Sequence, residues 1–209
     1  MMTIDEILAC GPVMPVIVID EAEQAVPLAE ALLAGGIQTA EVTLRTPAAL
    51  AAIEAMATHC PEITVGAGTV RSADQARAVA NAGGRFAVSP GTTSAVLAGC
   101  ADAGLPLLPG AATVSEMMAL SEQGYQRLKF FPATAAGGLG FIKSLASPLP
   151  DLAFCPTGGI TPDTAPDWLA LPNIACVGGS WVAPADLITK ADFAEITRRA
   201  RAAASLAKG

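Results

Sequence analysis

Short apolar runs recur along the chain, separated by longer segments in which apolar and polar residues mix at helical spacing. Successive runs begin 20 to 26 residues apart, which is the length of one strand, one helix and two short loops. Within each run the residues are apolar throughout rather than alternating, as expected for parallel strands buried on both faces. The eight runs span residues 13–19, 39–44, 63–68, 85–89, 105–110, 127–131, 152–157 and 173–178.

Several of the intervening segments carry start and stop signals of helices. Segment 28–36 ends on two glycines, a frequent signal at a helix C-terminus. Thr46 precedes a proline and is expected to cap a helix over 46–57, and Ser72 is expected to cap one over 72–84. Further helices are expected over 93–104, 115–124, 140–146, 162–170 and 191–207.

Eight strands that alternate with eight helices predict an α/β fold, a closed (β/α)₈ or TIM barrel, formed by one domain over residues 1–209. The alternative is an open, doubly wound sheet. That fold normally has fewer units at this length and a glycine-rich turn after its first strand. Here the first strand is followed by DEAEQ (20–24), which contains no glycine and favours the barrel.

Composition and charge narrow the possible partners. The net charge of −7 and the lack of a basic tract argue against nucleic acid. The acidic N-terminus does not resemble a signal peptide, and prolines and glycines interrupt the long apolar stretch 168–185, so no membrane association is expected. The five cysteines show no CxxC spacing, which predicts buried free thiols in the reducing cytoplasm rather than disulfides or a metal site.

Lys129 lies between Leu128 and Phe130 in an apolar strand, where an ammonium group is costly. Burial lowers the pKa of a lysine in general and makes the neutral amine available as a nucleophile. The alternative is a structural ion pair with a carboxylate. Glu41, between Ala40 and Val42, is the strand carboxylate that can either shuttle protons for such an amine or merely neutralise Lys129 or Arg45.

The ends of other strands offer groups that bind anions. Arg45 can hold a carboxylate in a two-pronged contact, and Thr69 follows a Gly-x-Gly bend from which its hydroxyl can join Arg45. Each is also compatible with an ordinary surface or turn position. Gly-Gly pairs end the seventh and eighth strands, where many barrels bind phosphate through backbone N–H groups; tight turns without a ligand are the alternative.

No pattern of metal ligands appears in the sequence, and no metal or other cofactor is expected. The only histidine, His59, lies at the expected end of a helix and is interpreted as a surface or capping residue. Schiff-base chemistry would allow carbon–carbon cleavage without a metal.

Taken in order, eight segments resemble one known family across nearly the whole chain. They resemble the aldolases of 2-keto-3-deoxy-6-phosphogluconate (KDPG) of the Entner–Doudoroff pathway, a family that also acts on 4-hydroxy-2-oxoglutarate (KHG). The segments are PVIVI, EVTLRTP, VGAGTV, SPG, LPGAAT, LKFFPA, FCPTGGITP and VGGSW.

The resemblance implies roles for individual residues. Lys129 in LKFFPA matches the Schiff-base lysine and Glu41 in EVTLRTP matches the general acid/base. The remaining matches are substrate-binding positions. Arg45 and Thr69 match the groups around the pyruvyl carboxylate, Pro90 and Phe131 the pocket wall, and Gly158, Gly159, Gly179 and Ser180 the phosphate site; Thr157 is a further substrate-binding position.

The resemblance also implies an activity and an assembly. The expected reaction cleaves KDPG into pyruvate and glyceraldehyde 3-phosphate, with KHG as a second substrate, in a cytoplasmic homotrimer. Three alternatives stay open: an aldolase for the galactonate-derived epimer, a phosphate-binding barrel isomerase, and a ligand-binding barrel without catalysis. Turnover of both epimers would separate the first alternative, a covalent pyruvate adduct the second, and release of pyruvate the third.

Overall fold

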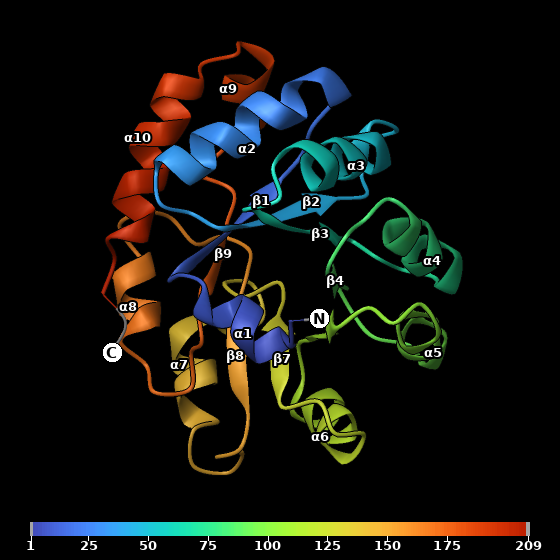
Figure 1. Cartoon of the computed structure of the whole chain (residues 1–209). Helices are drawn as coiled ribbons and strands as arrows, with labels where there is room; N and C mark the ends of the chain where they lie inside the picture. Colours follow the sequence, from blue (N-terminus) through green and yellow to red (C-terminus); the bar gives the residue numbers. More distant parts are fainter. Residues whose placement is uncertain (1, 208–209) are drawn as a thin grey trace.

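The computed structural model describes residues 2–207 and shows a ring of parallel strands wrapped by helices (Figure 1). Every strand pair in the ring is parallel. The strands are β1 (Val13–Ile17), β2 (Thr39–Thr43), β3 (Thr64–Gly68), β4 (Ala87–Val88), β5 (Leu107–Leu108), β6 (Gly110–Ala111), β7 (Arg127–Phe130), β8 (Ala153–Pro156) and β9 (Val177–Gly179).

The strands form two hydrogen-bonded sheets, and the ring is completed at the two places where these sheets meet. Strands β5 to β1 continue into β9 in one sheet, and β6, β7 and β8 form another. Only Pro109 separates β5 from β6, so these two short strands form one stave of the barrel. Isolated parallel bridges, Phe154 to Ile174 and Thr157 to Gly178, connect β8 with the segment that leads through β9. The expected (β/α)₈ barrel is confirmed, and the open sheet is excluded.

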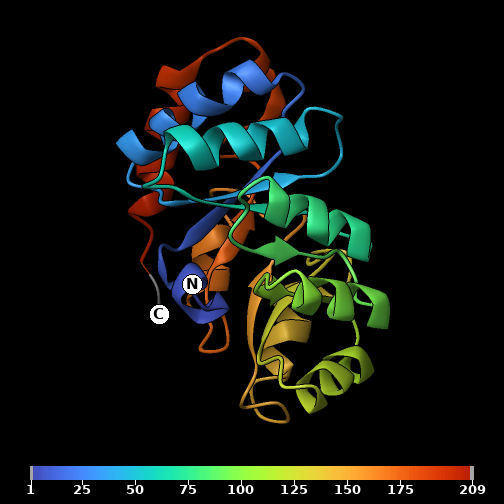
Figure 2. The ribbon, with the colours of Figure 1, turned by 45° about the vertical axis from the view of Figure 1, so that its right-hand side comes forward.

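Helices follow the strands around the outside of the ring, as the turned view shows (Figure 2). The helices are α1 (Ile4–Ala9), the 3₁₀ turn η1 (Ala22–Gln24), α2 (Ala25–Ala34), α3 (Ala49–His59), α4 (Ala73–Asn81), α5 (Ser94–Asp102), α6 (Val114–Glu122), α7 (Gly138–Ser144), α8 (Ala165–Leu169), α9 (Ala185–Thr189) and α10 (Phe193–Ala204). None of the helices within residues 2–207 combines the length and apolar character needed to cross a membrane.

Local capping explains where the expected helices hold and where they shift. Ser72 caps α4 through its side chain, which accepts a hydrogen bond from the backbone N–H of Gln75, as predicted. The prediction that Thr46 caps a helix over 46–57 is wrong, because that helix, α3, begins only at Ala49. The Thr46 hydroxyl instead donates to the carbonyl of Ile19 at the end of the neighbouring strand, 2.5 Å away. It therefore ties two strand ends together.

The eighth strand also starts later than the apolar pattern suggested. Residues 173–176 form a turn and an irregular segment, and β9 begins at Val177. The backbone N–H of Ile174 returns to the carbonyl of Leu171, and the Asn173 side chain donates to the carbonyl of Ile142. These local bonds compete with strand pairing, which explains the later start.

The interior of the barrel is filled at its amino-terminal end. A cluster of buried side chains from five strands or strand approaches meets Ile7 and Leu8 of α1; its other members are Met14, Phe86, Val88, Leu108, Cys155 and Cys176. Asp5 of α1 pairs with Arg127, the first residue of β7, so α1 covers this end of the ring (Figure 1). Apolar sequence runs did not reveal α1. The carboxyl-terminal end is left for the polar residues.

Cys60, Cys100 and Cys155 are buried free thiols, as predicted; Cys176 is buried as well, and Cys10 is only half-buried. Cys155 and Cys176 lie inside the barrel with their sulfur atoms 3.5 Å apart. Burial raises the pKa of the Cys100 thiol to about 11, because the apolar surroundings disfavour a thiolate.

Candidate active site

Lys129 points into the barrel from β7 and forms an ion pair with Glu41 of β2. The distance from Nζ to Oε1 is 3.0 Å, and the two side chains are only 5% and 2% exposed. The sequence singled out both residues and named Glu41 as a carboxylate that could serve or neutralise the amine, although 88 positions separate the two along the chain. The barrel brings them together because strands β2 and β7 face each other across its interior.

The Glu41 carboxylate fits inside the barrel only because Gly68 has no side chain. A Cβ atom at Gly68 would lie 2.1 Å from Oε1 of Glu41 and 2.7 Å from its Cγ. Two residues earlier on β3, Gly66 stands beside Glu41 in register and leaves room for the ring of Phe86. The Gly-x-Gly sequence predicted a bend. In the structure the two glycines leave space for the side chains of Glu41 and Phe86.

Phe131 follows β7 and turns its ring toward the lysine. The Lys129 ammonium lies 5.6 Å from the ring centroid, within the range of a cation–π contact. The ring is half-buried and also lies close to Gly158, where a Cβ atom would be 3.5 Å away from it. Phe131 is therefore placed as a wall between the lysine and the glycine turn.

Arg45 and Thr69 lie at the ends of neighbouring strands, and their side chains meet. The Arg45 Nε–H donates to the hydroxyl of Thr69 at 3.3 Å, as the sequence suggested. Thr69 has φ of 61°, a left-handed conformation that is unfavourable for a β-branched residue. The Arg45 guanidinium is exposed at the mouth, so it can reach an anion there.

Pro90 follows β4 at the same end of the ring. It is half-buried, and the fully buried Ser89 precedes it. The Ser89 hydroxyl accepts a hydrogen bond from the backbone N–H of Gly110 at 3.2 Å, which joins β4 to β6. Ser89 was not predicted from the sequence, because a serine before Pro-Gly is too common to indicate a buried hydrogen bond between strands.

The ends of β8 and β9 form the glycine-rich side of the mouth. Gly158 and Gly159 have φ of 104° and 78°, a region open to glycine at little cost. The Ala133 and Thr134 N–H groups donate to the carbonyls of Thr157 and Gly158 at 2.8 and 3.1 Å, which fixes this turn against the loop after β7.

Thr157 and Gly178 join the two glycine turns. They form a parallel bridge, and a Cβ atom at Gly178 would lie 2.2 Å from the Thr157 hydroxyl. Gly179 is buried and Ser180 is exposed at the turn after β9. Arg45, Thr69, Pro90, Phe131 and the residues of the two glycine pairs therefore lie at or just beyond the carboxyl-terminal ends of the strands, where barrels place their active sites, and Lys129 and Glu41 lie within their strands inside the barrel.

Among the described residues, no three histidine, cysteine, aspartate or glutamate side chains are grouped so that they could hold a metal ion. His59 is the last residue of α3 and is exposed, as expected. The site instead combines an amine, a carboxylate and backbone donors. This set can form a covalent imine, move protons and bind anions.

The chain matches the family model described as "KDPG and KHG aldolase" over residues 4–199. It is 48% identical over 204 residues to the KHG/KDPG aldolase of Escherichia coli K12, covering 98% of this chain and 96% of that protein.

Two solved structures are similar over nearly their whole length. One is KDPG aldolase from Legionella pneumophila with pyruvate captured as a covalent carbinolamine intermediate (46% identity, TM-score 0.95, covering 98% of this chain and 99% of that one). The other is the Zymomonas mobilis ZM4 KDPG aldolase with 3-phosphoglycerate (47% identity, TM-score 0.93, covering 99% and 97%). The chain belongs to the KDPG and KHG aldolase family.

Proposed function

We propose that Lys129 and Glu41 are the catalytic pair of a class I aldolase. The activity is cleavage of KDPG to pyruvate and glyceraldehyde 3-phosphate, with KHG cleaved to pyruvate and glyoxylate as a second reaction. The observation that carries the assignment is the buried 3.0 Å pair of an amine and a carboxylate at the barrel mouth. Relatives that carry these names, one of them trapped with covalent pyruvate, support the same chemistry.

The first half of the reaction makes the imine. Glu41 takes a proton from Nζ in the ion pair, the neutral Lys129 amine attacks the C2 ketone, and Glu41 moves protons from the nitrogen to the C2 oxygen so that the carbinolamine loses water. The resulting cationic imine withdraws electrons from C3. When a base removes the C4 hydroxyl proton, the C3–C4 bond breaks, its electron pair moves to C3 as an enamine, and the aldehyde leaves.

The second half regenerates the enzyme. The enamine is protonated at C3, and water attacks the imine carbon, which releases pyruvate and the free amine of Lys129. Glu41 lies where it can serve both proton transfers, because its oxygen already contacts Nζ. Each half-reaction needs a proton to be taken and returned, so one carboxylate is sufficient.

Polar groups at the barrel mouth are assigned to the two anionic ends of the substrate. Arg45 and Thr69, joined by a hydrogen bond, are assigned to the pyruvyl carboxylate. Thr157, Gly158, Gly159, Gly179 and Ser180 are assigned to the phosphate, with Pro90 and Phe131 as walls between the two ends. A relative solved with 3-phosphoglycerate supports a phosphorylated substrate.

Borohydride reduction in the presence of pyruvate tests the catalytic pair. The expected product is a single modified peptide that contains Lys129. Lys143 and Lys190, both exposed, serve as internal controls for nonspecific modification. Modification at either control alone, or none at all, would remove the Schiff-base assignment. Turnover of KDPG compared with its galactonate-derived epimer decides between the two sugar acids.

The assembly proposed for the chain is a homotrimer in the cytoplasm. Val114 and Met118 are exposed on one face of α6, at 37% and 48%, and such apolar side chains favour a contact between subunits. Free thiols are typical of a reducing compartment. Light scattering coupled to size-exclusion chromatography should give three times the mass of the 21.0 kDa chain; a monomer would contradict the trimer.

A further inference from the structure

Trp181 follows the glycine turn of β9 and folds its indole back over Gly179. A Cβ atom at Gly179 would lie 2.5 Å from Cζ3 of the Trp181 ring and 2.6 Å from Cη2. The ring therefore lies directly against the backbone of the turn that carries Ser180. The indole therefore cannot move toward Gly179 without displacing the backbone of this turn.

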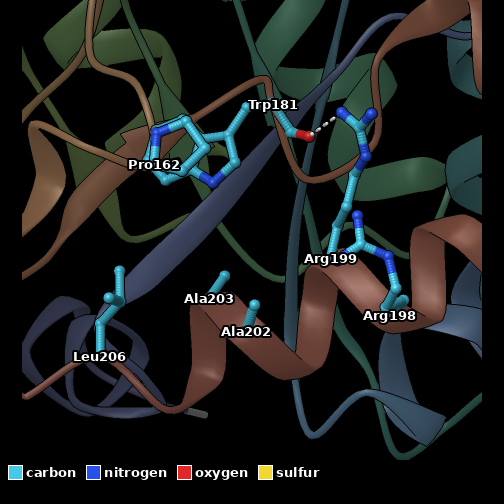
Figure 3. A pocket seen from close by; sticks show the side chains of 7 residues that line it. All are labelled: Pro162, Trp181, Arg198, Arg199, Ala202, Ala203 and Leu206. Carbon is cyan, nitrogen blue, oxygen red and sulfur yellow. Dashed lines mark hydrogen bonds between the residues drawn. The ribbon is translucent and has the colours of Figure 1, made fainter.

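Helix α10 holds the same turn through Arg199. The guanidinium Nη1 donates to the carbonyl of Trp181 at 3.1 Å (Figure 3). Its Nε donates to Oε1 of Glu195 at 2.8 Å. Glu195 is also bound by Arg198, with distances of 2.6 and 2.7 Å. The hydrogen bonds from Arg198 and Arg199 lower the pKa of Glu195 to about 2, so it remains an acceptor at neutral pH.

The helix itself is a fixed support. Asp192 caps its start by accepting from the Glu195 N–H, and the Thr197 hydroxyl donates to the carbonyl of Ala31 in α2 at 3.1 Å. Ala200 packs so closely on Gly35 that a Cβ atom there would be 2.3 Å from its own. Arg199 therefore connects the turn to a packed helix pair rather than to a mobile surface.

On the side of the indole away from the turn there is open space. A cavity of about 350 Å³ lies between Trp181, Pro162, the last turn of α10 with Ala202, and Leu206 just beyond that helix (Figure 3). Packing alone therefore does not keep the indole in place. The hydrogen bond from Arg199 to the carbonyl is the polar contact that holds the turn on that side.

We infer that Arg199, oriented by Glu195, is a positioning residue for the phosphate-binding turn Gly179–Ser180–Trp181. It acts through the Trp181 carbonyl and does not touch the substrate. The inference rests on the proposed function, because it assumes that this turn binds the substrate phosphate. Its consequence is selective: loss of Arg199 weakens binding of a phosphorylated substrate and spares a substrate that lacks phosphate.

The test compares Arg199→Met with Arg198→Met. Both variants lose one positive charge and one partner of Glu195, but only Arg199 contacts the turn. For Arg199→Met, KM for KDPG should rise about tenfold, the change that about 1.4 kcal/mol makes in an equilibrium constant. The kcat/KM for KHG should stay within about twofold. Arg198→Met should leave both substrates near wild type, and Arg199→Lys should recover part of the loss.

Three outcomes would overturn the inference. Equal effects of the two methionine variants on KDPG would mean that charge, not the turn, matters. An equal fall for KDPG and KHG in Arg199→Met would mean general damage, which a lower melting temperature would accompany. If wild-type protein formed no pyruvate adduct and cleaved neither substrate, the proposed function would fail first and this inference with it.

Discussion

The two ends of the barrel mouth differ in whether side chains or backbone groups face it. At the end proposed to bind the pyruvyl group, charged and hydroxyl side chains on or next to β2, β3 and β7 form the contacts, and the central pair is almost completely buried. At the end proposed to bind phosphate, the Gly158–Gly159 turn follows β8, Gly179 ends β9, and Ser180 is exposed. One site therefore combines buried side chains, which have a large desolvation cost, with backbone donors, which have a small one.

The difference has a physical origin. A buried charge is tolerated only when a partner of suitable geometry is present, so the lysine and glutamate depend on each other and on the space around them. Backbone N–H groups carry no desolvation cost of that size, and they can approach an anion wherever glycine removes the Cβ atom. Substitutions at the pyruvate end should therefore affect every substrate, and those at the phosphate end only phosphorylated ones.

The largest effect is expected for Glu41→Gln. The amide keeps the shape of the side chain beside Lys129 but cannot exchange protons. General acid/base groups contribute about 10²–10⁴-fold, so kcat should fall by that factor on both KDPG and KHG while KM changes little. Steady-state kinetics measure this directly. A kcat near that of wild type would leave Glu41 as a structural partner of Lys129.

The second largest effect is expected for Gly68→Ala, because the added methyl group would occupy the position of the Glu41 carboxylate. A displacement of about 1 Å can lower a rate about 10²-fold, and kcat on both substrates should fall by this order. Gly66→Ala is the matched control: its methyl group meets Phe86 rather than Glu41. Both variants should lose about 1–3 kcal/mol of unfolding free energy from overpacking, measured in urea. Equal kcat values in the two would contradict a specific role for Gly68.

Gly159→Ala should have a smaller effect that depends on the substrate. The residue has φ of 78°, and a Cβ atom would lie 2.5 Å from the Thr134 hydroxyl, so the turn must shift. We expect KM for KDPG to rise roughly tenfold, equivalent to about 1.4 kcal/mol, with KHG little changed. Gly104→Ala controls for backbone strain, since it has φ of 66° and open space around it, away from the mouth. An equal loss on KDPG and KHG would remove the support for a phosphate site here.

The same contrast explains what could be predicted from the sequence. Lys129 and Glu41 stood out because a charge within an apolar strand conflicts with the cost of its burial. The eight-strand rhythm was equally readable, since both-face burial leaves continuous apolar runs. The glycine turns, by contrast, could only be placed by their position after strands, because glycine pairs occur in many tight turns.

Other features depended on contacts that the sequence does not reveal. Gly68 makes room for a side chain on a neighbouring strand, and Trp181 folds over Gly179 only in three dimensions. The late start of α3 arose because the Thr46 hydroxyl binds a distant carbonyl instead of capping the helix. Local propensity gave the elements, whereas long-range hydrogen bonds and steric fit determined their ends and the shape of the site.

The smallest effect is expected for Thr69→Gly, and it should separate stability from function. Left-handed strain at a residue other than glycine is of order 1–3 kcal/mol, while the greater chain entropy of glycine offsets roughly 1 kcal/mol of the gain. Unfolding free energy in urea should therefore rise by about 1 kcal/mol. Loss of the hydroxyl that meets Arg45 should lower kcat/KM about fivefold, as expected for roughly 1 kcal/mol of hydrogen bonding. The fall should be the same for KDPG and KHG, because both substrates share the pyruvyl carboxylate.

Ala191→Gly is the control for Thr69→Gly. Ala191 also has positive φ, 53°, but it follows α9, so its substitution should change stability alone. A fall confined to KDPG would instead place Thr69 with the phosphate end of the pocket.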